Sequence, residues 1–356
     1  MKPELTHRLL SLLKEYQSLG IAEQIDYKKF YLYSIITHST AIEGSTVTEI
    51  ENMLLFDEGI TATGRSLQEQ MMNLDLKAAY EHSMRLAQQH TDFSVEMLKG
   101  LSTLVMKNTG SSYNTAQGSF DASKGDLRLV SVTAGIGSSS YMSYLKVPAK
   151  LTEFCQQLNE RRRQLLATDD LLAKYLLSFD AHYQLVTIHP WVDGNGRMSR
   201  LVMNHLQYEL GLVPTKIIKE EKAEYIQALV DSREQESLEP FREFMLEEHT
   251  RNIAKEIEEY KKSQAFDPMN GYSGQKNDQK NKKWPENWPK KWPEKASRIL
   301  VSMAANPSIT IAEMEARLNV GHTTLKKILH EMQSEGIIRR VGPDKGGHWE
   351  VVGESH

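Results

Sequence analysis

The most informative stretch of this 356-residue sequence is segment 189–200, which reads HPWVDGNGRMSR. Within it, Gly194-Asn195-Gly196 is a tight turn whose two glycines permit unusual backbone dihedrals and a close approach of the backbone. The turn comes directly before a helical pattern over 198–210. A glycine turn that opens a helix presents backbone N–H groups and the positive end of the helix dipole to an anion. The segment therefore predicts an anion-binding nest.

Two arginines and two other polar side chains surround this turn. Arg197 and Arg200 are three positions apart and share one face of the first helical turn, where two guanidinium groups suit a polyphosphate. Asp193 supplies a hard oxygen ligand for Mg²⁺, and His189 has a side chain whose ordinary pKa suits proton removal near neutrality. A helix-capping loop with a solvated basic turn would explain each residue taken alone. Together they predict a site for phosphoryl or nucleotidyl transfer.

The same segment closely resembles the signature of the Fic family, His-Pro-Phe-x-Asp/Glu-Gly-Asn-Gly-Arg-x-x-Arg. Trp191 replaces the usual Phe, and this aromatic side chain is still expected to anchor the loop in the core. Ser199 stands where many members have Gly. The resemblance extends over about residues 30–250. It implies a mainly helical fold with a small β-hairpin flap, and transfer of AMP from ATP to a Ser, Thr or Tyr hydroxyl of a protein.

The resemblance also implies a role for each matching residue of the turn. His189 would take the proton from the incoming hydroxyl, and Asp193 would bind Mg²⁺. Asn195, with the backbone at Gly194 and Gly196, would hold the α- and β-phosphates of ATP.

The rest of ATP is expected to lie against later residues. By the resemblance, Arg197 would support the β-phosphate and Arg200 the γ-phosphate. Tyr225, Ile226 and Leu229 would flank the adenine. The family often carries a paired aromatic in this helix, and Ile226 replaces the second one. Transfer of UMP or phosphocholine therefore stays open beside transfer of AMP.

A second, shorter pattern lies upstream. Residues 39–44, STAIEG, are similar to the family's Ser/Thr-x-x-x-Glu-Gly/Asn motif, which marks an N-terminal inhibitory helix, expected here at about 27–44. On this interpretation Glu43 pairs with Arg200 and occupies the guanidinium group that should bind the γ-phosphate. Ser39, one helical turn earlier, would face the same side. The alternative is an ordinary helix end, with a glutamate before a glycine stop.

Helical periodicity dominates residues 1–261, which we assign to the Fic domain. Helices are expected near 4–18, 27–42, 67–90, 94–107, 148–166, 170–188, 196–210, 222–234 and 238–261. His182 is expected to pack between helices. The Gly- and Ser-rich stretch 118–145 interrupts the pattern, and its β-prone run 127–132 predicts the hairpin flap. Such a flap would hold a target segment by backbone pairing.

Two further regions follow. Residues 262–295 are predicted to be a linker, although three Trp-Pro repeats starting at Trp284, Trp288 and Trp292 also suit a docking motif. Residues 296–356 are predicted to form a winged helix-turn-helix domain. Its elements are expected near 295–305, 311–318 and 323–335 for the helices, and 336–341 and 348–352 for the strands.

Charge restricts the partners of this C-terminal domain. The whole chain has a net charge of -4, and residues 296–356 hold seven basic and seven acidic side chains. DNA binding would therefore need a local patch, formed by Lys326, Lys327, Arg339, Arg340 and Lys345. Docking of a protein is an equal alternative. A DNA-binding regulator with a nucleotide-sensing Fic body competes with the enzyme, but a pure sensor has no need of the base His189.

Composition also bears on location. The sequence has no apolar run near the roughly 18 residues that span a bilayer, and its first 20 residues have the pattern of an amphipathic helix. With Cys155 as the single cysteine, an internal disulfide is excluded. We therefore expect a cytoplasmic protein without a membrane partner. Its substrate would be a protein hydroxyl, with self-modification as one form of the reaction.

Overall fold

The computed structural model describes residues 3–133 and 140–265 and, toward the C-terminus, residues 299, 302–303, 306–318, 321–334, 337–342 and 347–351. The chain divides into two compact units, Met1–Gly271 and Tyr272–His356, and each is considered by itself. Helix α10 (Glu239–Ala265) ends four residues later than the predicted boundary at 261. The remainder of the predicted linker, with its Trp-Pro repeats, lies outside the described residues.

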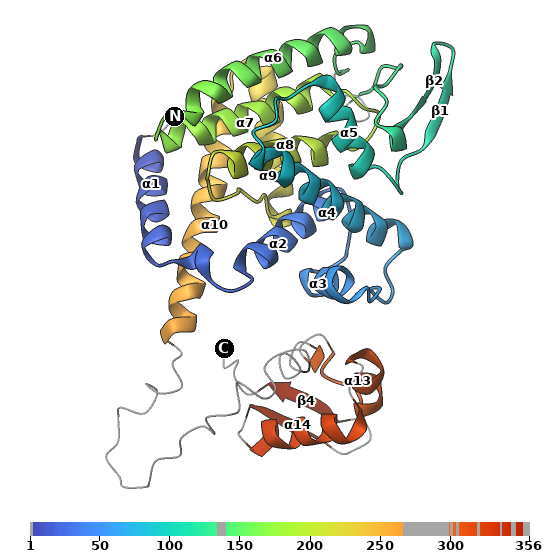
Figure 1. Ribbon diagram of the computed structural model, residues 1–356, viewed down its shortest axis with the longest axis vertical. Coiled ribbons are helices and arrows are strands. Elements are labelled where there is room, and N and C mark those ends of the chain that lie inside the picture. The colour runs from blue at the N-terminus through green and yellow to red at the C-terminus, as the bar shows by residue number, and fades with distance from the viewer. Residues whose placement is uncertain are drawn as a thin grey trace. The chain divides into compact units, whose positions relative to one another are not determined.

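The first unit is mainly helical, as predicted (Figure 1). Besides α10, its α-helices are α1 (Pro3–Ser18), α2 (Tyr27–Ile42), α3 (Glu49–Glu58), α4 (Leu67–Gln88), α5 (Val95–Val105), α6 (Val147–Leu166), α7 (Leu171–Ile188), α8 (Asn195–Glu209) and α9 (Lys222–Glu234). Every predicted helix of this unit is present, and only α3 was not predicted. Its start is a capping box in which Thr48 and Glu51 bond to each other's backbone N–H, a Thr-x-x-Glu signal that the sequence does contain.

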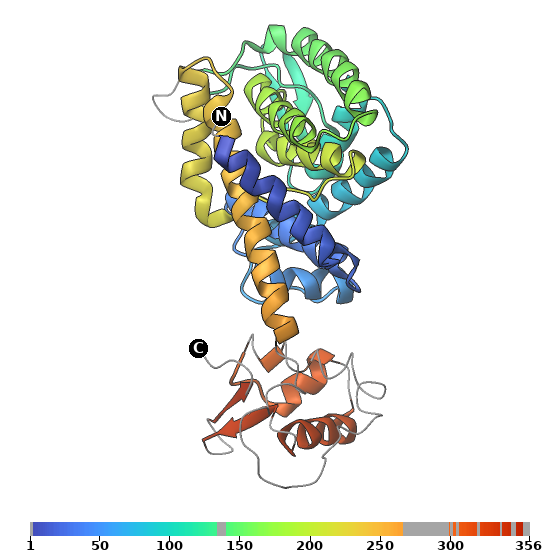
Figure 2. The same cartoon turned by 90° about the vertical axis from the view of Figure 1, so that its left-hand side faces the viewer.

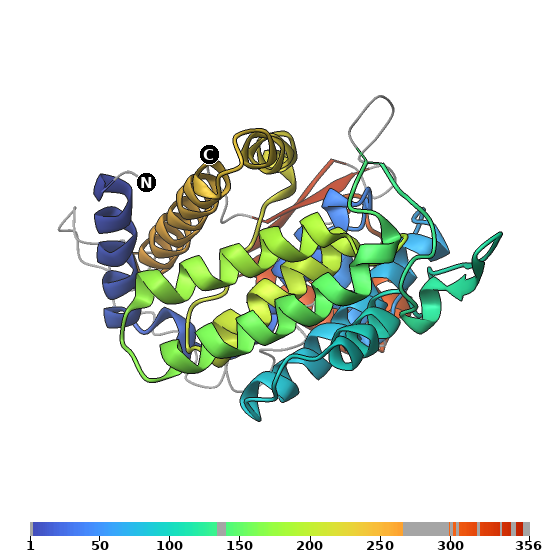
Figure 3. The same cartoon turned by 90° about the horizontal axis from the view of Figure 1, so that it is seen from above.

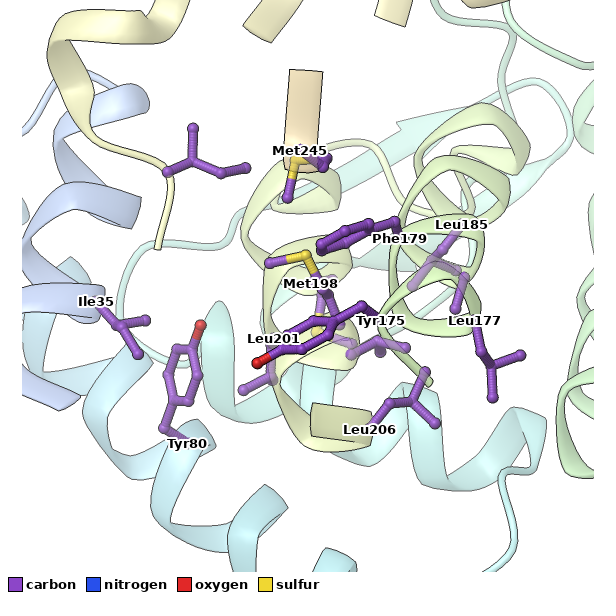
Figure 4. Packing of buried hydrophobic residues seen from close by; sticks show 14 of the residues in the cluster. Ile35, Tyr80, Tyr175, Leu177, Phe179, Leu185, Met198, Leu201, Leu206 and Met245 are labelled. Carbon is purple, nitrogen blue, oxygen red and sulfur yellow. The ribbon is translucent and has the colours of Figure 1, made fainter. Parts of the chain in front are cut away.

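Helix α8 forms the centre of the unit, because nearly all of its side chains are buried. Helices α6, α7 and α8 lie side by side (Figure 3), and α1 runs along α10 (Figure 2). In the core, Phe179 and Leu185 of α7 lie in one cluster with Met198 and Leu201 of α8, and all four are fully buried (Figure 4). This packing on every side fixes the N-terminal end of α8, where segment 189–200 lies.

The hairpin predicted within 118–145 is present only as a bridge between Thr133 and Ser140 with a hydrogen bond from the Tyr141 N–H to the Val132 carbonyl, and a regular hairpin that was not predicted precedes it. The strands are β1 (Ser112–Thr115) and β2 (Gly118–Asp121), which pair antiparallel and extend away from the helices (Figure 1). Residues 127–132 themselves form no regular strand, and the Arg128 N–H donates to the Pro190 carbonyl instead of to a partner strand. Directly after them, Thr133 and Ser140 form an isolated bridge. Residues 134–139 between these two lie outside the described residues.

The described part of the second unit follows the predicted order of elements. After helical residues at 299 and 302–303 come α13 (Ile311–Leu318), α14 (His322–Ser334) and an antiparallel pair, β3 (Ile338–Val341) with β4 (His348–Val351). The predicted cap Thr310 accepts a hydrogen bond from the Glu313 N–H. The unit has its own apolar cluster, in which the Trp349 indole donates to the Ile309 carbonyl at 3.1 Å.

A search of the described residues finds no helix with the length and apolar character needed to cross a membrane.

Candidate functional site

The turn at 194–196 opens α8 as the sequence predicts. Gly194 is the N-cap residue with φ 80°, and no side chain caps the helix there. A Cβ atom on Gly194 would come within 2.7 Å of the Met106 sulfur, so both the dihedral and the packing favour glycine. The first intrahelical bond runs from Met198 N–H to the Gly194 carbonyl. The N–H groups of the first turn therefore have no intrahelical acceptor and are directed toward an incoming anion.

The side chain of Asn195 has a different position from the one that phosphate binding would require. Its amide oxygen accepts from the Trp191 N–H at 3.1 Å, and its amide nitrogen donates to the Trp191 carbonyl at 2.9 Å. Trp191 itself is buried, as predicted, and its indole donates to the Gly125 carbonyl. Asn195 thus holds the loop in shape, and only its backbone N–H remains for a phosphate.

Arg197 lies buried beside the turn and has unused hydrogen-bonding capacity. Its Nη2 is 3.2 Å from the Met106 sulfur and 3.6 Å from Asp193 Oδ1, whereas its Nε and Nη1 are buried without a partner. Burial lowers the pKa of this guanidinium group. A buried donor without an acceptor is costly, and an anion at the start of α8 would supply the acceptor.

Arg200, by contrast, is bound to helix α2 through its Nε and Nη2. Its Nε donates to Ser39 Oγ at 2.8 Å, and its Nη2 donates to the Ser39 carbonyl at 3.0 Å and to Glu43 Oε1 at 2.5 Å. Arg200 is 3% exposed. The structure therefore brings together residues 157 positions apart, as the two sequence motifs predicted.

The carboxylate of Glu43 reaches the anion nest itself. A Cβ atom added to Gly196 would lie 2.6 Å from Glu43 Oε1, so the carboxylate sits against the first turn of α8. Burial alone would raise the pKa of Glu43, but the charge of Arg200 and its hydrogen bond outweigh burial and hold the pKa below its usual value. An ionised carboxylate thus occupies the place where a phosphate would approach α8.

His189 ends helix α7 with φ 52°, in the left-handed region. Its Nδ1 is 3.2 Å from the Val186 carbonyl, which suits an N–H at Nδ1 and leaves Nε2 as the basic nitrogen. The ring stacks on Tyr141, with 3.7 Å between centroids and 16° between planes. Burial lowers the pKa of His189 to about 4, so the imidazole is neutral at physiological pH. The stack with Tyr141 was not predicted from the sequence.

Arg128 was also missed, although it connects several parts of the site. It is 1% exposed, and its guanidinium group donates to three carbonyls: those of His189 at 2.7 Å, Val130 at 2.7 Å and Met142 at 2.5 Å. One side chain therefore binds the backbone at residue 189 and at both ends of the segment 130–142. The sequence carried no signal for it, because in a β-prone run an arginine between Leu127 and Leu129 would point to the opposite face from the leucines and is expected to be exposed.

Tyr225, which was predicted to flank the adenine, lies largely in the core. It is 2% exposed, its hydroxyl is 2.9 Å from His182 Nε2, and its ring packs against Phe241 and Phe244. Core side chains thus cover most of its ring, and its place beside the adenine stays a prediction. Ile226, 45% exposed, is the accessible neighbour. His182 is fully buried and packs between helices, as predicted.

Asp193 has room for a metal ion. Its side chain is 60% exposed, and its Oδ1 accepts from the Gly194 N–H at 2.6 Å. Among the described residues, no three His, Cys, Asp or Glu side chains form a metal-binding group. A single carboxylate fits Mg²⁺, which commonly takes one protein carboxylate together with waters and substrate phosphates.

A small cavity of about 10 Å³ is lined in part by Ser39 and Arg200, whereas the two larger ones lie elsewhere. One of about 650 Å³ is lined from α2 and α10, including Tyr31 and Glu256, and another of about 400 Å³ lies near Tyr16. No residue of segment 189–200 lines either of them. The candidate site is therefore a helix end whose anion position Glu43 already fills, and an open pocket is not expected there.

Comparisons with known proteins agree with this geometry. Residues 92–207 match the sequence model of the Fic/DOC family. A curated relative, protein adenylyltransferase fic-1 of Caenorhabditis briggsae, is 25% identical over 202 residues, which are 56% of this chain and 36% of the relative. This chain thus matches only about a third of that relative's length.

Two solved structures show the same fold. A Fic-domain-containing signalling protein of Bacteroides thetaiotaomicron aligns with a TM-score of 0.59 at 21% identity, over 72% of this chain and 97% of that one. A Fic family protein of Desulfovibrio desulfuricans aligns with a TM-score of 0.55 at 18% identity, over 100% of this chain and 98% of that one. Residues 92–207 thus match the Fic/DOC family model, and the fold is the one that these solved structures share.

Proposed function

We propose that this protein is a protein adenylyltransferase, which transfers AMP from ATP to a side-chain hydroxyl of a protein, and that Glu43 restrains the reaction. The observation that carries the proposal is the start of α8, where a glycine turn, a buried guanidinium group with unused donors and a neutral histidine surround one anion position. The relatives named protein adenylyltransferase support the same reaction.

The chain's residues divide the work of the reaction. His189 Nε2 takes the proton from the acceptor hydroxyl, whose oxygen forms a bond to the α-phosphorus of ATP. The bond from the α-phosphorus to the bridging oxygen breaks, and pyrophosphate leaves. The N–H groups of the first α8 turn, Arg197 and, once it is free, Arg200 bind the charge on the departing phosphates. Mg²⁺ held by Asp193 would add further charge compensation there.

A labelling experiment tests the proposal. The Glu43→Gly variant is incubated with cell lysate and, separately, with ATP or UTP labelled at the α-phosphate or CDP-choline labelled in its phosphocholine group. Protein labelled from ATP alone is expected. Labelling from UTP or CDP-choline in place of ATP would show that the transferred group is UMP or phosphocholine and not AMP. If no compound labels any protein, including the variant itself, the transferase proposal fails.

The pH dependence of transfer reports the state of His189. Since burial lowers its pKa to about 4, the base stays neutral and active from pH 7.5 to 5.5, and the rate should be nearly flat over that range. With a histidine base of the ordinary pKa of about 6.5, the rate would fall about tenfold between pH 7.5 and 5.5, because protonation removes the lone pair of the base. The measurement is kcat/KM against pH in the Glu43→Gly background. A tenfold fall would contradict a buried base.

One observation favours a second function, DNA binding, for the C-terminal unit. Lys326 and Lys327 lie next to each other and exposed on α14, the helix that a helix-turn-helix places in the major groove. On β3, however, Arg339 is paired with Glu350 at 2.6 Å, and Arg340 lies over the Trp349 ring. Of the predicted patch, Arg339 is thus paired with an acidic side chain, and Lys345 lies outside the described residues.

If this unit binds DNA, the affinity of the full chain for a duplex should fall steeply with salt. Neutralising Lys326 and Lys327 should reduce the slope of log K against log salt by about two, because each phosphate contact releases about one counterion. Fluorescence anisotropy from low to physiological salt measures both quantities. No binding at low salt would favour docking of a protein instead.

A further inference from the structure

The side chain of Asn73, on helix α4, is bonded to the chain on both sides of Glu43. It is fully buried, and its Oδ1 accepts from Thr40 Oγ1 at 2.7 Å. Its Nδ2 donates to Ser45 Oγ at 3.1 Å and to the Glu69 carbonyl at 2.8 Å. Thr40 lies three residues before Glu43, and Ser45 lies two residues after it. One buried amide of α4 therefore holds both ends of the short segment that carries Glu43.

The orientation of this amide is fixed by its neighbours. The Glu69 carbonyl can only accept, so the nitrogen must face it and the oxygen must face Thr40. Asn52 of α3, also fully buried, donates from its Nδ2 to Asn73 Oδ1 and to Thr37 Oγ1 of α2, both at 2.8 Å. Each polar atom of the Asn73 amide thus has two partners, and a buried group with all of its hydrogen bonds made is held rigidly.

The segment around Glu43 has a flexible backbone of its own. Gly44 has φ 104°, and a Cβ atom there would meet no heavy atom within 4 Å apart from its chain neighbours. Glycine permits many backbone conformations, so residue 44 does not hold Glu43 in place. The Thr46 N–H donates to Glu69 Oε1 at 2.7 Å, which is a second bond to α4, but this pair is exposed. Asn73 is the buried part of the attachment.

Helix α4 is bonded to α8 as well. Tyr80, two turns after Asn73, donates from its hydroxyl to Asn204 Oδ1 of α8 at 2.7 Å, and both side chains are buried. Asn204 lies one turn after Arg200. The two partners of the ion pair, Glu43 and Arg200, are therefore attached to the same helix, and α4 sets the spacing between them.

From these contacts, and on the basis of the restraint proposed for Glu43, we infer that Asn73 is a positioning residue, which keeps the Glu43 carboxylate on Arg200. Its bonds go to Thr40 and Ser45 and act on Glu43 through the backbone. Without the amide, the segment 40–45 can move away from α8, and the γ-phosphate of ATP competes for Arg200 with a carboxylate that is less often there. The rate of transfer then rises, although no residue of the reaction has changed.

Labelling from ATP in the otherwise wild-type chain tests the inference. Asn73→Ala is expected to raise the rate about fivefold, which is the effect of one hydrogen bond of ordinary strength on an equilibrium. Ser45→Ala is the milder change, because it removes one of the two attachments, and it should give a smaller rise. In the Glu43→Gly background, Asn73→Ala should add nothing, because the carboxylate that it positions is gone.

The matched control is a buried asparagine on another helix. Asn159 of α6 bonds to the N–H and to the carbonyl of Phe93, both at 2.8 Å. Asn159→Ala therefore also removes buried hydrogen bonds and should lower stability, but it should leave the labelling rate per folded molecule unchanged. An equal rise in Asn159→Ala would overturn the inference. So would the absence of a rise in both Asn73→Ala and Ser45→Ala while Glu43→Gly labels faster than wild type.

A spectroscopic signature needs no transfer activity. The Arg200 Nε–H is buried and donates to Ser39 Oγ of α2 at 2.8 Å, so its proton should exchange slowly with solvent. NMR of the chain with ¹⁵N-labelled arginine, with this signal assigned through Arg200→Ala, measures the exchange. It should be about fivefold faster in Asn73→Ala, by the same loss of a hydrogen bond, and unchanged in Asn159→Ala.

The two measurements separate the failure of the inference from the failure of the proposed function. If no protein is labelled, even by Glu43→Gly, the proposed transferase activity fails, and the exchange of the Arg200 proton still decides the role of Asn73. Unchanged exchange in Asn73→Ala, in a chain that thermal unfolding shows to be folded, would overturn the inference whatever the enzyme does.

Discussion

Replacing His189 with alanine is expected to lower protein labelling by about 10²- to 10⁴-fold, the usual contribution of a general base, while ATP binds almost as before. The physical reason is a division of roles. The basic Nε2 of His189 serves the incoming hydroxyl, whereas the donors for the phosphates come from the first turn of α8 and from Arg197. Labelling and nucleotide affinity are measured together, in the Glu43→Gly background.

The control for this prediction is a histidine outside the reaction. His182 is fully buried, with its Nε2 bonded to the Tyr225 hydroxyl, so His182→Phe should affect stability more than chemistry. Its labelling rate per folded molecule should stay within about tenfold of the parent. Full labelling by His189→Ala, or an equal loss in both variants, would remove His189 from the mechanism.

The sequence predicted the chemistry of the site better than its surroundings. Glycine at 194 and the paired arginines follow from short-range patterns, because a helix end and its dipole are determined within one or two turns, whereas Glu43 was singled out by resemblance to a family motif. Glu43 and Arg200 are 157 positions apart in the sequence, and their contact was predicted only through the resemblance to a family. No periodicity in this sequence places those two side chains together.

The unpredicted features share a physical cause. Tyr225 was predicted to flank the adenine, and the sequence did not indicate that packing against Phe241 and Phe244 buries most of its ring. The run 127–132 has β propensity, yet the buried guanidinium group of Arg128 takes up the carbonyls of Val130 and Met142, which a strand would need. In both cases contacts with residues distant in the sequence determine the burial or the backbone conformation, and local sequence patterns do not show those contacts.

Removal of the proposed restraint by Glu43 gives the largest predicted increase in activity. Glu43→Gly is expected to raise labelling by about 10²-fold, because removing the carboxylate lets the γ-phosphate reach Arg200, and small misplacements of reacting groups can cost that much. Glu43→Gln is the matched variant: it keeps the size and an oxygen for Arg200 but not the charge, so intermediate activation is expected. Rates are measured with ATP and Mg²⁺ saturating.

The pair with Arg200 makes the prediction specific. Arg200→Ala also breaks the ion pair, but it removes the group that would bind the γ-phosphate, so this variant should stay weak. The double variant should be no faster than Arg200→Ala, since no guanidinium group remains to be released. Such non-additivity is expected only when two residues act through the same interaction.

The competing explanation is that Glu43 only ends helix α2 before Gly44, whose φ is 104°. On that explanation Glu43→Gly would lower the free energy of unfolding and leave the rate unchanged. The contact geometry argues against this explanation. Glu43 Oε1 lies 2.5 Å from Arg200 Nη2 and beside Gly196 in the anion nest, and ending a helix requires neither contact. Thermal unfolding and labelling of the same preparations decide between the two: lower stability without faster labelling would leave Glu43 a structural residue.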